Sequence, residues 1–216
     1  MFKKISFLSI ICFLVFSACL SAQVRYGVYA KGGVSDFIER NFEKSVKFGN
    51  SYSSLPSYNF GVDVIFPFSK SDSSVFQFIS GIDFGSFAAK NSMSESFSAP
   101  GYDGPYSWNE RLYSLSIPAK VNFKFERWVH VYGGFVYTFN LNKPEEMWNK
   151  KFNKSTLSVT GGVDFFILNR FVVGASYYRN VTPLMKILKK PHELKTETFK
   201  CSYYVQQICL KIGYIF

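Results

Sequence analysis

The chain has 216 residues, a formal net charge of +10 and an aromatic content of 19%. The positive charge favours anionic lipid or polysaccharide as a partner, whereas the lack of a basic helix or a known binding motif argues against nucleic acid. After residue 22 no apolar run approaches the roughly 20 residues that a membrane-spanning helix needs, so the sequence predicts no such helix there.

The first 22 residues are typical of a secretory signal peptide. Lys3 and Lys4 precede an apolar run from Ile5 to Leu20, and Ser21-Ala22-Gln23 provides small residues for cleavage. We therefore predict a signal peptide over residues 1–22 and a single mature domain over residues 23–216.

Three cysteines bear on processing and redox state. Lipoprotein processing at Cys19 is an alternative to cleavage after Ala22. Cys201 and Cys209 lie in the predicted mature domain, and eight residues of strand between them span about 26 Å. A disulfide needs Cα atoms within about 7 Å, so we expect both thiols to be unpaired.

Eight stretches of the mature domain alternate apolar and polar residues, the period-two pattern of strands with two unlike faces. They are Val24–Val34, Ser57–Phe66, Val75–Phe87, Leu112–Phe125, Trp128–Asn140, Leu157–Leu168, Phe171–Asn180 and Cys201–Phe216. An even number of strands lets an up-and-down meander close into an antiparallel barrel with both termini on one side.

The connections between these stretches alternate between long and short. The long ones are Ser35–Leu55, Ala88–Arg111, Leu141–Thr156 and Val181–Lys200, and the short ones are Pro67–Ser74, Glu126-Arg127 and Asn169-Arg170. Outer-membrane barrels have short periplasmic turns and longer extracellular loops. If the first strand starts in the periplasm, all four long loops lie outside the cell. Residues 98–106, rich in Gly and Pro, should be irregular.

The last stretch shows the alternation most clearly, and a tilted strand needs about 9–11 residues to cross a bilayer. An aromatic last residue preceded by alternating apolar positions resembles the C-terminal signal of outer-membrane β-barrels. We therefore assign Leu210, Ile212, Tyr214 and Phe216 to a barrel-assembly signal. An ordinary buried terminal strand is the alternative.

The alternation separates an uncharged apolar face from a face that carries charge. A soluble eight-stranded barrel would turn the apolar face inward, and a membrane barrel turns it outward. A Lys or Arg on the lipid face costs roughly 2–4 kcal/mol at the bilayer midplane, so the midspan charges belong inside. With the signal peptide, Phe216 and the alternating loop lengths, this predicts an all-β fold: an eight-stranded antiparallel up-and-down transmembrane β-barrel.

One residue conflicts with a regular ladder. Pro118 lies inside the fourth predicted strand and cannot donate a ladder hydrogen bond. Because a closed barrel has no edge strand on which to place it, we expect a β-bulge at Pro118.

Three segments resemble the PorT-like outer-membrane β-barrel protein family. Leu112–Val121 is similar to that family's Tyr-Leu-x-Ile-Pro strand, Tyr26–Gly33 to its opening Gly-x-x-x-Gly strand, and Ala175–Asn180 to its penultimate strand, with one Gly replaced. The resemblance implies an integral barrel in the outer membrane of a Gram-negative bacterium. The family's namesake is linked to protein secretion and gliding.

An eight-stranded barrel is just wide enough to be filled by its own side chains. The predicted inward face carries Arg25, Lys31, Asp63, Asp83, Lys120, Lys124, Asp164 and Lys211. Charges buried away from water need partners, so we expect the three aspartates to pair with Lys31, Lys120 or Lys211 and to plug the lumen. A solute pathway is the alternative.

Catalysis would require a nucleophile, a base and an orienting group within hydrogen-bond reach. His130, which points inward, and His192, beside Pro191, are the two histidines, and neither neighbours a Ser or Asp at a recognised spacing. A structural role is favoured for both, and a hydrolase centred on His130 is the weakest alternative. No metal-ligand or phosphate-binding motif is present, so the sequence implies no metal and no cofactor.

We expect a non-enzymatic membrane scaffold that displays four extracellular loops. The lysine-rich third and fourth loops are either solvated surface or contacts for lipopolysaccharide phosphates or a partner protein. The expected partners are outer-membrane lipid and lipopolysaccharide, the barrel-assembly machinery and other envelope proteins. A narrow porin or transporter for small solutes is the alternative function.

Overall fold

The computed structural model describes residues 24–41, 50–68, 75–93, 107–143, 151–189 and 199–216. These residues form strands joined by turns. The strands are β1 Arg25–Asn41, β2 Asn50–Pro67, β3 Phe76–Met93, β4 Ser107–Glu126, β5 Val129–Asn140, β6 Lys151–Phe152, β7 Ser155–Ile167, β8 Phe171–Asn180, β9 Met185–Lys189 and β10 Phe199–Ile215. Within this part of the chain no helix has the length and apolarity to cross a membrane. The predicted signal peptide, residues 1–22, lies outside the described residues.

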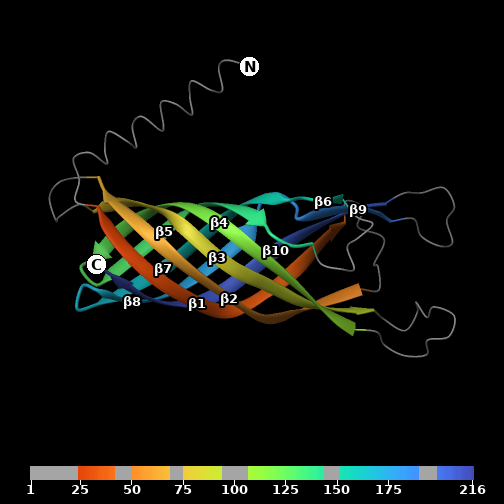
Figure 1. Ribbon diagram of the computed structural model, residues 1–216, viewed down its shortest axis with the longest axis horizontal. Helices are drawn as coiled ribbons and strands as arrows, with labels where there is room; N and C mark the ends of the chain where they lie inside the picture. The colour runs from red at the N-terminus through yellow and green to blue at the C-terminus, as the bar shows by residue number, and fades with distance from the viewer. Residues whose placement is uncertain (1–23, 42–49, 69–74, 94–106, 144–150, 190–198) are drawn as a thin grey trace, which may run out of the picture.

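Eight long strands close into an antiparallel barrel in the order β1-β2-β3-β4-β5-β7-β8-β10, with β10 pairing back onto β1 (Figure 1). Closure begins near the termini, where the Phe216 amide donates to the Tyr26 carbonyl at 2.8 Å. Beyond the end of β8, the short strand β9 pairs with β10, and β6 pairs with β9. The predicted eight-stranded up-and-down barrel is confirmed.

The two ends of the barrel differ. At one end, which we call the turn end, lie residues 127–128, residues 168–170 and the C-terminus; at the other, the loop end, lie β6 and β9 (Figure 1). The strands reach further toward the loop end than the alternation predicted: β1 continues to Asn41, β2 begins at Asn50 and β4 begins at Ser107. Parts of the predicted loops are therefore strand. The irregular stretch expected at residues 98–106 lies outside the described residues.

The bulge predicted at Pro118 is wrong. β4 keeps one register with β5 through Pro118, and its pairing with β3 has the same register before and after this residue. The β3 ladder omits the pairs that Ile117 and Pro118 would make, and the Ser80 hydroxyl donates to the Pro118 carbonyl at 2.9 Å. Because Pro118 has no amide hydrogen to donate, two pairs are missing from the β3–β4 ladder, and no extra residue is inserted into β4. The described register shifts lie instead at Ser54/Tyr58 and Lys124/Glu126.

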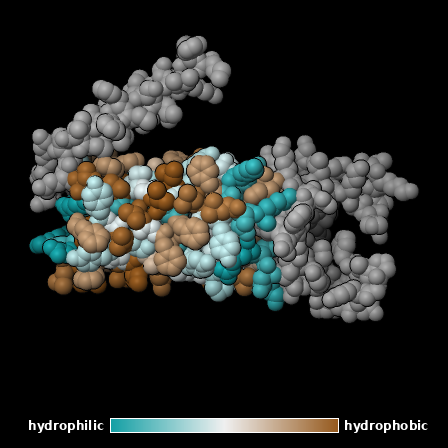
Figure 2. All heavy atoms as spheres, viewed as in Figure 1, coloured by the Kyte–Doolittle hydropathy of each residue, from teal (hydrophilic) through white to brown (hydrophobic). Residues whose placement is uncertain are grey.

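The outer wall is apolar and the inner wall polar over most of the barrel. Large exposed side chains on the outside include Phe60, Ile82, Phe135, Leu210 and Ile212. Figure 2 shows apolar side chains spread over the middle of this wall, with hydrophilic ones toward the two ends, most of them toward the loop end. Inward residues such as Asn59, Ser116, Asn122, Ser158 and Gln207 are buried. The face assignment made from the alternation matches this arrangement.

Candidate functional site

Six charged side chains converge on the middle of the lumen, each from a different strand. They are Lys31 of β1, Asp63 of β2, Asp83 of β3, Lys120 of β4, Asp164 of β7 and Lys211 of β10. All six belong to the inward phase of their strands, because alternate residues of a strand face the same side. Lys31 is partly exposed and the other five are buried.

The six charges form ion pairs. Lys120 Nζ lies 3.1 Å from Asp63 Oδ1, and Lys211 Nζ lies 3.7 Å from Asp63 Oδ2 and 2.8 Å from Asp164 Oδ2. Lys31 Nζ donates to Asp83 Oδ2 at 3.1 Å. Three ammonium groups thus lie against three carboxylates, the partners that the sequence suggested. A buried charge is tolerated when it is paired in this way.

Two tyrosine rings complete this layer. The Nζ atoms of Lys31, Lys211 and Lys120 lie 4.6, 5.2 and 5.8 Å from the centroid of the Tyr29 ring. Lys120 and Lys211 also lie 5.3 and 5.7 Å from the Tyr132 ring centroid, within the range of cation–π attraction. We call Tyr29, Tyr132 and the six charged residues the lumen septum.

Glycines on neighbouring strands make room for these rings. Gly61 pairs with Tyr29, and Gly162 pairs with Tyr132. A Cβ atom at either glycine would come within 3.0 Å of ring atoms of the paired tyrosine. The rings therefore lie flat across positions where a side chain would block them.

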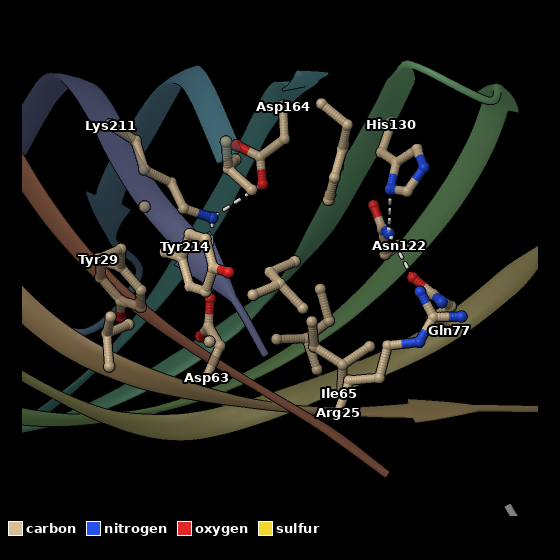
Figure 3. Close-up of a pocket in the computed structure, with 17 residues that line it drawn as sticks. Arg25, Tyr29, Asp63, Ile65, Gln77, Asn122, His130, Asp164, Lys211 and Tyr214 are labelled. Atoms are coloured by element: carbon tan, nitrogen blue, oxygen red, sulfur yellow. Dashed lines mark hydrogen bonds and ion pairs between the residues drawn. The ribbon is translucent and has the colours of Figure 1, made fainter. Parts of the chain in front are cut away.

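A cavity of about 30 Å³ lies on each side of the septum. The cavity nearer the turn end is shown in Figure 3, and its polar lining includes Arg25, Asp63, Gln77, Asn122, His130, Asp164 and Lys211. The cavity nearer the loop end has a lining that includes Lys31, Asn59, Asp83, Ser116, Lys120, Tyr178 and Gln207. Each is large enough for one or two water molecules.

The other two predicted lumen charges lie outside the septum. Arg25 lines the cavity near the turn end, and Lys124 pairs across the β4–β5 ladder with His130. Both stand closer to the turn end than the six septum charges. The structure therefore brings together six of the eight charges that the sequence singled out.

His130 occupies a hydrogen-bonded, aromatic environment. Its Nδ1 lies 3.1 Å from Asn122 Nδ2, and that amide also donates to Gln77 Oε1 at 3.0 Å (Figure 3). The His130 ring centroid lies 4.0 Å from that of Phe166. These contacts position the ring structurally, and none of them supplies a nucleophile. His192 lies outside the described residues.

Cys209 is a free, buried thiol, as predicted, whereas the side chain of Cys201 lies outside the described set. No cluster of three or more His, Cys, Asp or Glu residues that could hold a metal ion occurs within the described ranges.

Neutral hydrogen bonds fill the lumen between the septum and the loop end. Thr138 Oγ1 lies 2.9 Å from Ser116 Oγ and 3.1 Å from Tyr178 Oη, and the Ser158 hydroxyl donates to Tyr178 Oη at 2.7 Å. On the facing wall, Gln207 Nε2 donates to the side chains of Ser57 and Asn59. Satisfied polar groups of this kind pack rigidly.

An apolar cluster, which the sequence reasoning missed, closes the loop end. We call it the loop-end plug. It contains Phe37, Phe87, Ala89, Leu112, Val136, Tyr178, Leu184, Met185, Tyr203 and Val205, with Phe152 packed against it. The predicted fourth loop contributes to it, because the Leu184 amide donates to the Tyr203 carbonyl at 2.7 Å and Asn153 Nδ2 donates to the Pro183 carbonyl at 2.6 Å. Six of its ten members already lie on the inward phase of the predicted strands, and continuing that phase of β1 and β3 into the predicted loops would have added Phe37 and Ala89.

An apolar outer wall around a charged, filled interior defines a transmembrane β-barrel, since a barrel surrounded by water would have the reverse arrangement. The chain belongs to the outer membrane protein beta-barrel domain family, whose sequence model matches residues 8–216. It is therefore an outer-membrane protein.

Solved structures with similar folds include three outer-membrane proteins. OprG from Pseudomonas aeruginosa shares 12% identity over 91% of this chain and 98% of its own, with a TM-score of 0.44. AlkL in DMPC lipid bilayers shares 13% identity over 90% of this chain and 91% of its own, with a TM-score of 0.44. Neisserial surface protein A shares 14% identity over 88% of this chain and 96% of its own, with a TM-score of 0.43. No curated protein matches the sequence significantly.

Proposed function

We propose that the protein is a non-enzymatic scaffold whose side-chain-filled barrel holds four extracellular loops above the outer membrane. The observation that carries this proposal is the succession of septum, hydrogen-bonded layer and loop-end plug along the lumen. A barrel of this size has room for its own side chains or for one small ligand, and here side chains occupy the space.

Single-channel recording in planar bilayers tests the filled lumen. The purified protein should give no stable large conductance, because ions would have to displace paired charges and an apolar cluster in turn. A persistent, large, voltage-stable conductance from folded protein would overturn the proposal.

A narrow porin or transporter for small solutes is the second candidate. It draws on the two cavities of about 30 Å³, which interrupt the filled lumen on either side of the septum. Proteoliposomes loaded with small sugars and amino acids would separate the candidates. The scaffold predicts efflux no faster than from protein-free liposomes, and the transporter predicts saturable efflux.

The PorT-like resemblance of β1, β4 and β8 supports a role in secretion or in a larger envelope assembly. A scaffold without chemistry of its own would act through partners: outer-membrane lipid and lipopolysaccharide, and other envelope proteins. Pull-down from detergent-solubilised native membranes should recover an envelope protein in fixed ratio. A barrel hydrolase is the remaining alternative, and an unchanged phenotype on His130→Ala would remove it.

The outward face of β10 would also carry the signal that the barrel-assembly machinery reads. Leu210, Ile212 and Phe216 are exposed on that face, and the Tyr214 ring packs edge-on against Phe171 and Phe216 at 5.1 Å. Phe216→Ser should lower the amount of folded barrel in the outer membrane, while Ile215→Ser, next to it in the chain, should lower it less. Equal losses in the two variants would argue against a specific signal.

A further inference from the structure

We propose that the outer wall formed by β4, β5, β7 and β8 binds the phosphate groups of an outer-leaflet glycolipid. The binding residues are Arg111, Lys143, Lys154 and Arg179, which we call the basic row. This inference names the lipid partner of the proposed scaffold and rests on that function.

The basic row crosses neighbouring strands at the loop end. Asn142 Nδ2 donates to the Arg111 carbonyl at 3.0 Å, so the segment that carries Lys143 is bonded to β4. The Asn140 amide donates to the Lys154 carbonyl at 2.8 Å, which places Lys154 beside the end of β5. Arg179 of β8 pairs with Val159 of β7. The four cations are therefore distributed along a continuous part of the wall.

The row lies just beyond a group of outward-facing aromatic rings. Arg111 lies on the same face of β4 as Tyr113, and Arg179 lies on the same face of β8 as Tyr177. Each arginine stands two residues, or about 7 Å, nearer the loop end than its tyrosine. Tyr113 and Tyr177 are exposed on the outer wall, as are Tyr137 and Phe139 of β5. Aromatic girdles mark the membrane–water interfaces of outer-membrane barrels, so the cations stand at headgroup level.

The charge on this part of the wall is one-sided. Glu110 of β4, which belongs to the inward phase, is buried, and no other carboxylate lies near the loop end on the described residues of β4, β5, β7 and β8. On the facing wall, β1 presents Asp36 instead. An anionic ligand is thus favoured at the basic row and disfavoured across the barrel.

Arg111 is held in place for such a ligand. Its Nη1 donates to Ser86 Oγ of β3 at 2.8 Å, and its guanidinium carbon lies 5.9 Å from the ring centroid of Tyr58 on β2, so the guanidinium lies over β3 at the edge of the row. A guanidinium fixed against the wall keeps further N–H groups for a phosphate, which it can bind in bidentate fashion.

The apolar surface next to the basic row favours binding of a phosphorylated lipid over binding of a soluble phosphate. The exposed side chains beside it and below it, toward the turn end, are apolar, and they include Ile117, Phe135, Val159 and Val173. A ligand that covers both surfaces must join a phosphorylated head to acyl chains. Phosphorylated lipid A has this chemistry, and inorganic phosphate has only half of it.

Binding of bis-phosphorylated lipid A to the refolded protein in detergent tests the proposal. Lipid A should raise the unfolding temperature of the wild type and remain bound in native mass spectrometry. Dephosphorylated lipid A, phosphatidylglycerol and inorganic phosphate should do so more weakly. The variant Arg111→Gln/Arg179→Gln should bind lipid A about tenfold more weakly, because each basic residue near a membrane surface adds attraction to anionic lipid. Arg111→Lys/Arg179→Lys should keep most of the affinity.

The matched control removes two exposed arginines from the turn end, Arg127→Gln/Arg170→Gln, and should leave lipid A binding unchanged. Equal binding of phosphorylated and dephosphorylated lipid A would overturn the proposal, as would equal losses in the two double variants. Binding of inorganic phosphate as strong as that of lipid A would assign the row to a soluble anion instead. The scaffold function stands or falls separately, on the conductance recordings.

Discussion

At the scale of single residues, Asp63 links two lysines of the septum, because it contacts both Lys120 and Lys211. Asp63→Asn keeps the shape of the side chain but removes the charge that both ammonium groups face. Leaving a buried charge without its partner costs about 3–5 kcal/mol. We expect the variant to lose about that much unfolding free energy in urea titrations of the micelle-bound protein.

The control for Asp63 is Glu126→Gln, which neutralises an exposed carboxylate at the turn end. Surface changes of this kind usually stay within about 0.5 kcal/mol. If the two variants were equally stable, the septum charges would contribute nothing to holding the barrel together.

Gly61 and Gly32 form a second matched pair. A Cβ at Gly61 would collide with the Tyr29 ring, whereas a Cβ at Gly32 meets nothing within 4 Å. Gly61→Ala should destabilise the barrel by about 1–3 kcal/mol through overpacking. Gly32→Ala should be neutral or stabilising by up to about 1 kcal/mol, because it restricts the unfolded chain. Urea titration of both variants measures the difference, and a destabilised Gly32→Ala would contradict the packing argument.

The sequence predicted which charged residues face the lumen, because period two fixes the side of every residue once one face is known. It also predicted that the three aspartates meet lysines. It could not predict that Asp63 would bridge two lysines, since β2, β4 and β10 are not all neighbours and the distances across the lumen depend on barrel closure. The places of Tyr29 and Tyr132 over the lysines depend on the same closure.

At the scale of elements, the turn between β7 and β8 has an unfavourable sequence for its conformation. Leu168 and Asn169 have φ angles of 53° and 60°, and the Arg170 amide donates to the Ile167 carbonyl at 3.2 Å. This is the geometry of a two-residue turn that favours Asn-Gly, and the left-handed region costs an ordinary residue about 1–2 kcal/mol. Leu168 is also 83% exposed.

Replacing this turn by Leu168→Asn/Asn169→Gly should therefore stabilise the barrel by about 1–2 kcal/mol, measured as a higher urea midpoint. Arg127→Gly is the control, because the turn between β4 and β5 has no residue with positive φ among its described positions. Glycine there only adds freedom to the unfolded chain, so it should destabilise. A stabilising Arg127→Gly would show that the gain is unrelated to backbone conformation.

The ends of the strands were predicted best where a tight turn joins two neighbouring strands. They were predicted worst at the loop end, where the strands extend beyond the membrane. The limits of β8, which follows such a turn, match the prediction, whereas β1, β2, β3 and β4 extend well past it toward the loop end. Ser and Asn are the commonest residues of those extensions, and their composition resembles loop more than strand. The bulge predicted at Pro118 was wrong for another reason. A ladder can omit two pairs without changing register, and no pattern in the sequence reveals such an omission.

At the scale of the whole molecule, the lumen changes character along its axis. Where the outer wall is apolar, the interior is built from ion pairs and hydrogen bonds. At the loop end the interior becomes apolar, with Phe37, Leu112 and Tyr203 almost fully buried. A barrel segment surrounded by water gains stability by burying apolar surface, and one surrounded by lipid does not. The inner face therefore changes from polar to apolar because the surroundings of the outer wall change from lipid to water.

The septum and the loop-end plug lie in series, so opening one should not open the lumen. We expect Asp63→Ser/Lys120→Ser, which shortens two septum side chains, to give no more conductance than the wild type in planar bilayers. Leu184→Ser/Met185→Ser, which opens the plug, should also remain silent. The combination of all four substitutions should conduct small ions, because a continuous water path can then run from one end of the barrel through the two cavities to the other end. Folding is checked for each variant by the mobility difference between unboiled and boiled samples in gels. If a folded septum variant conducted as well as the folded combination, the plug would be no barrier, and a silent folded combination would place the closure elsewhere in the lumen.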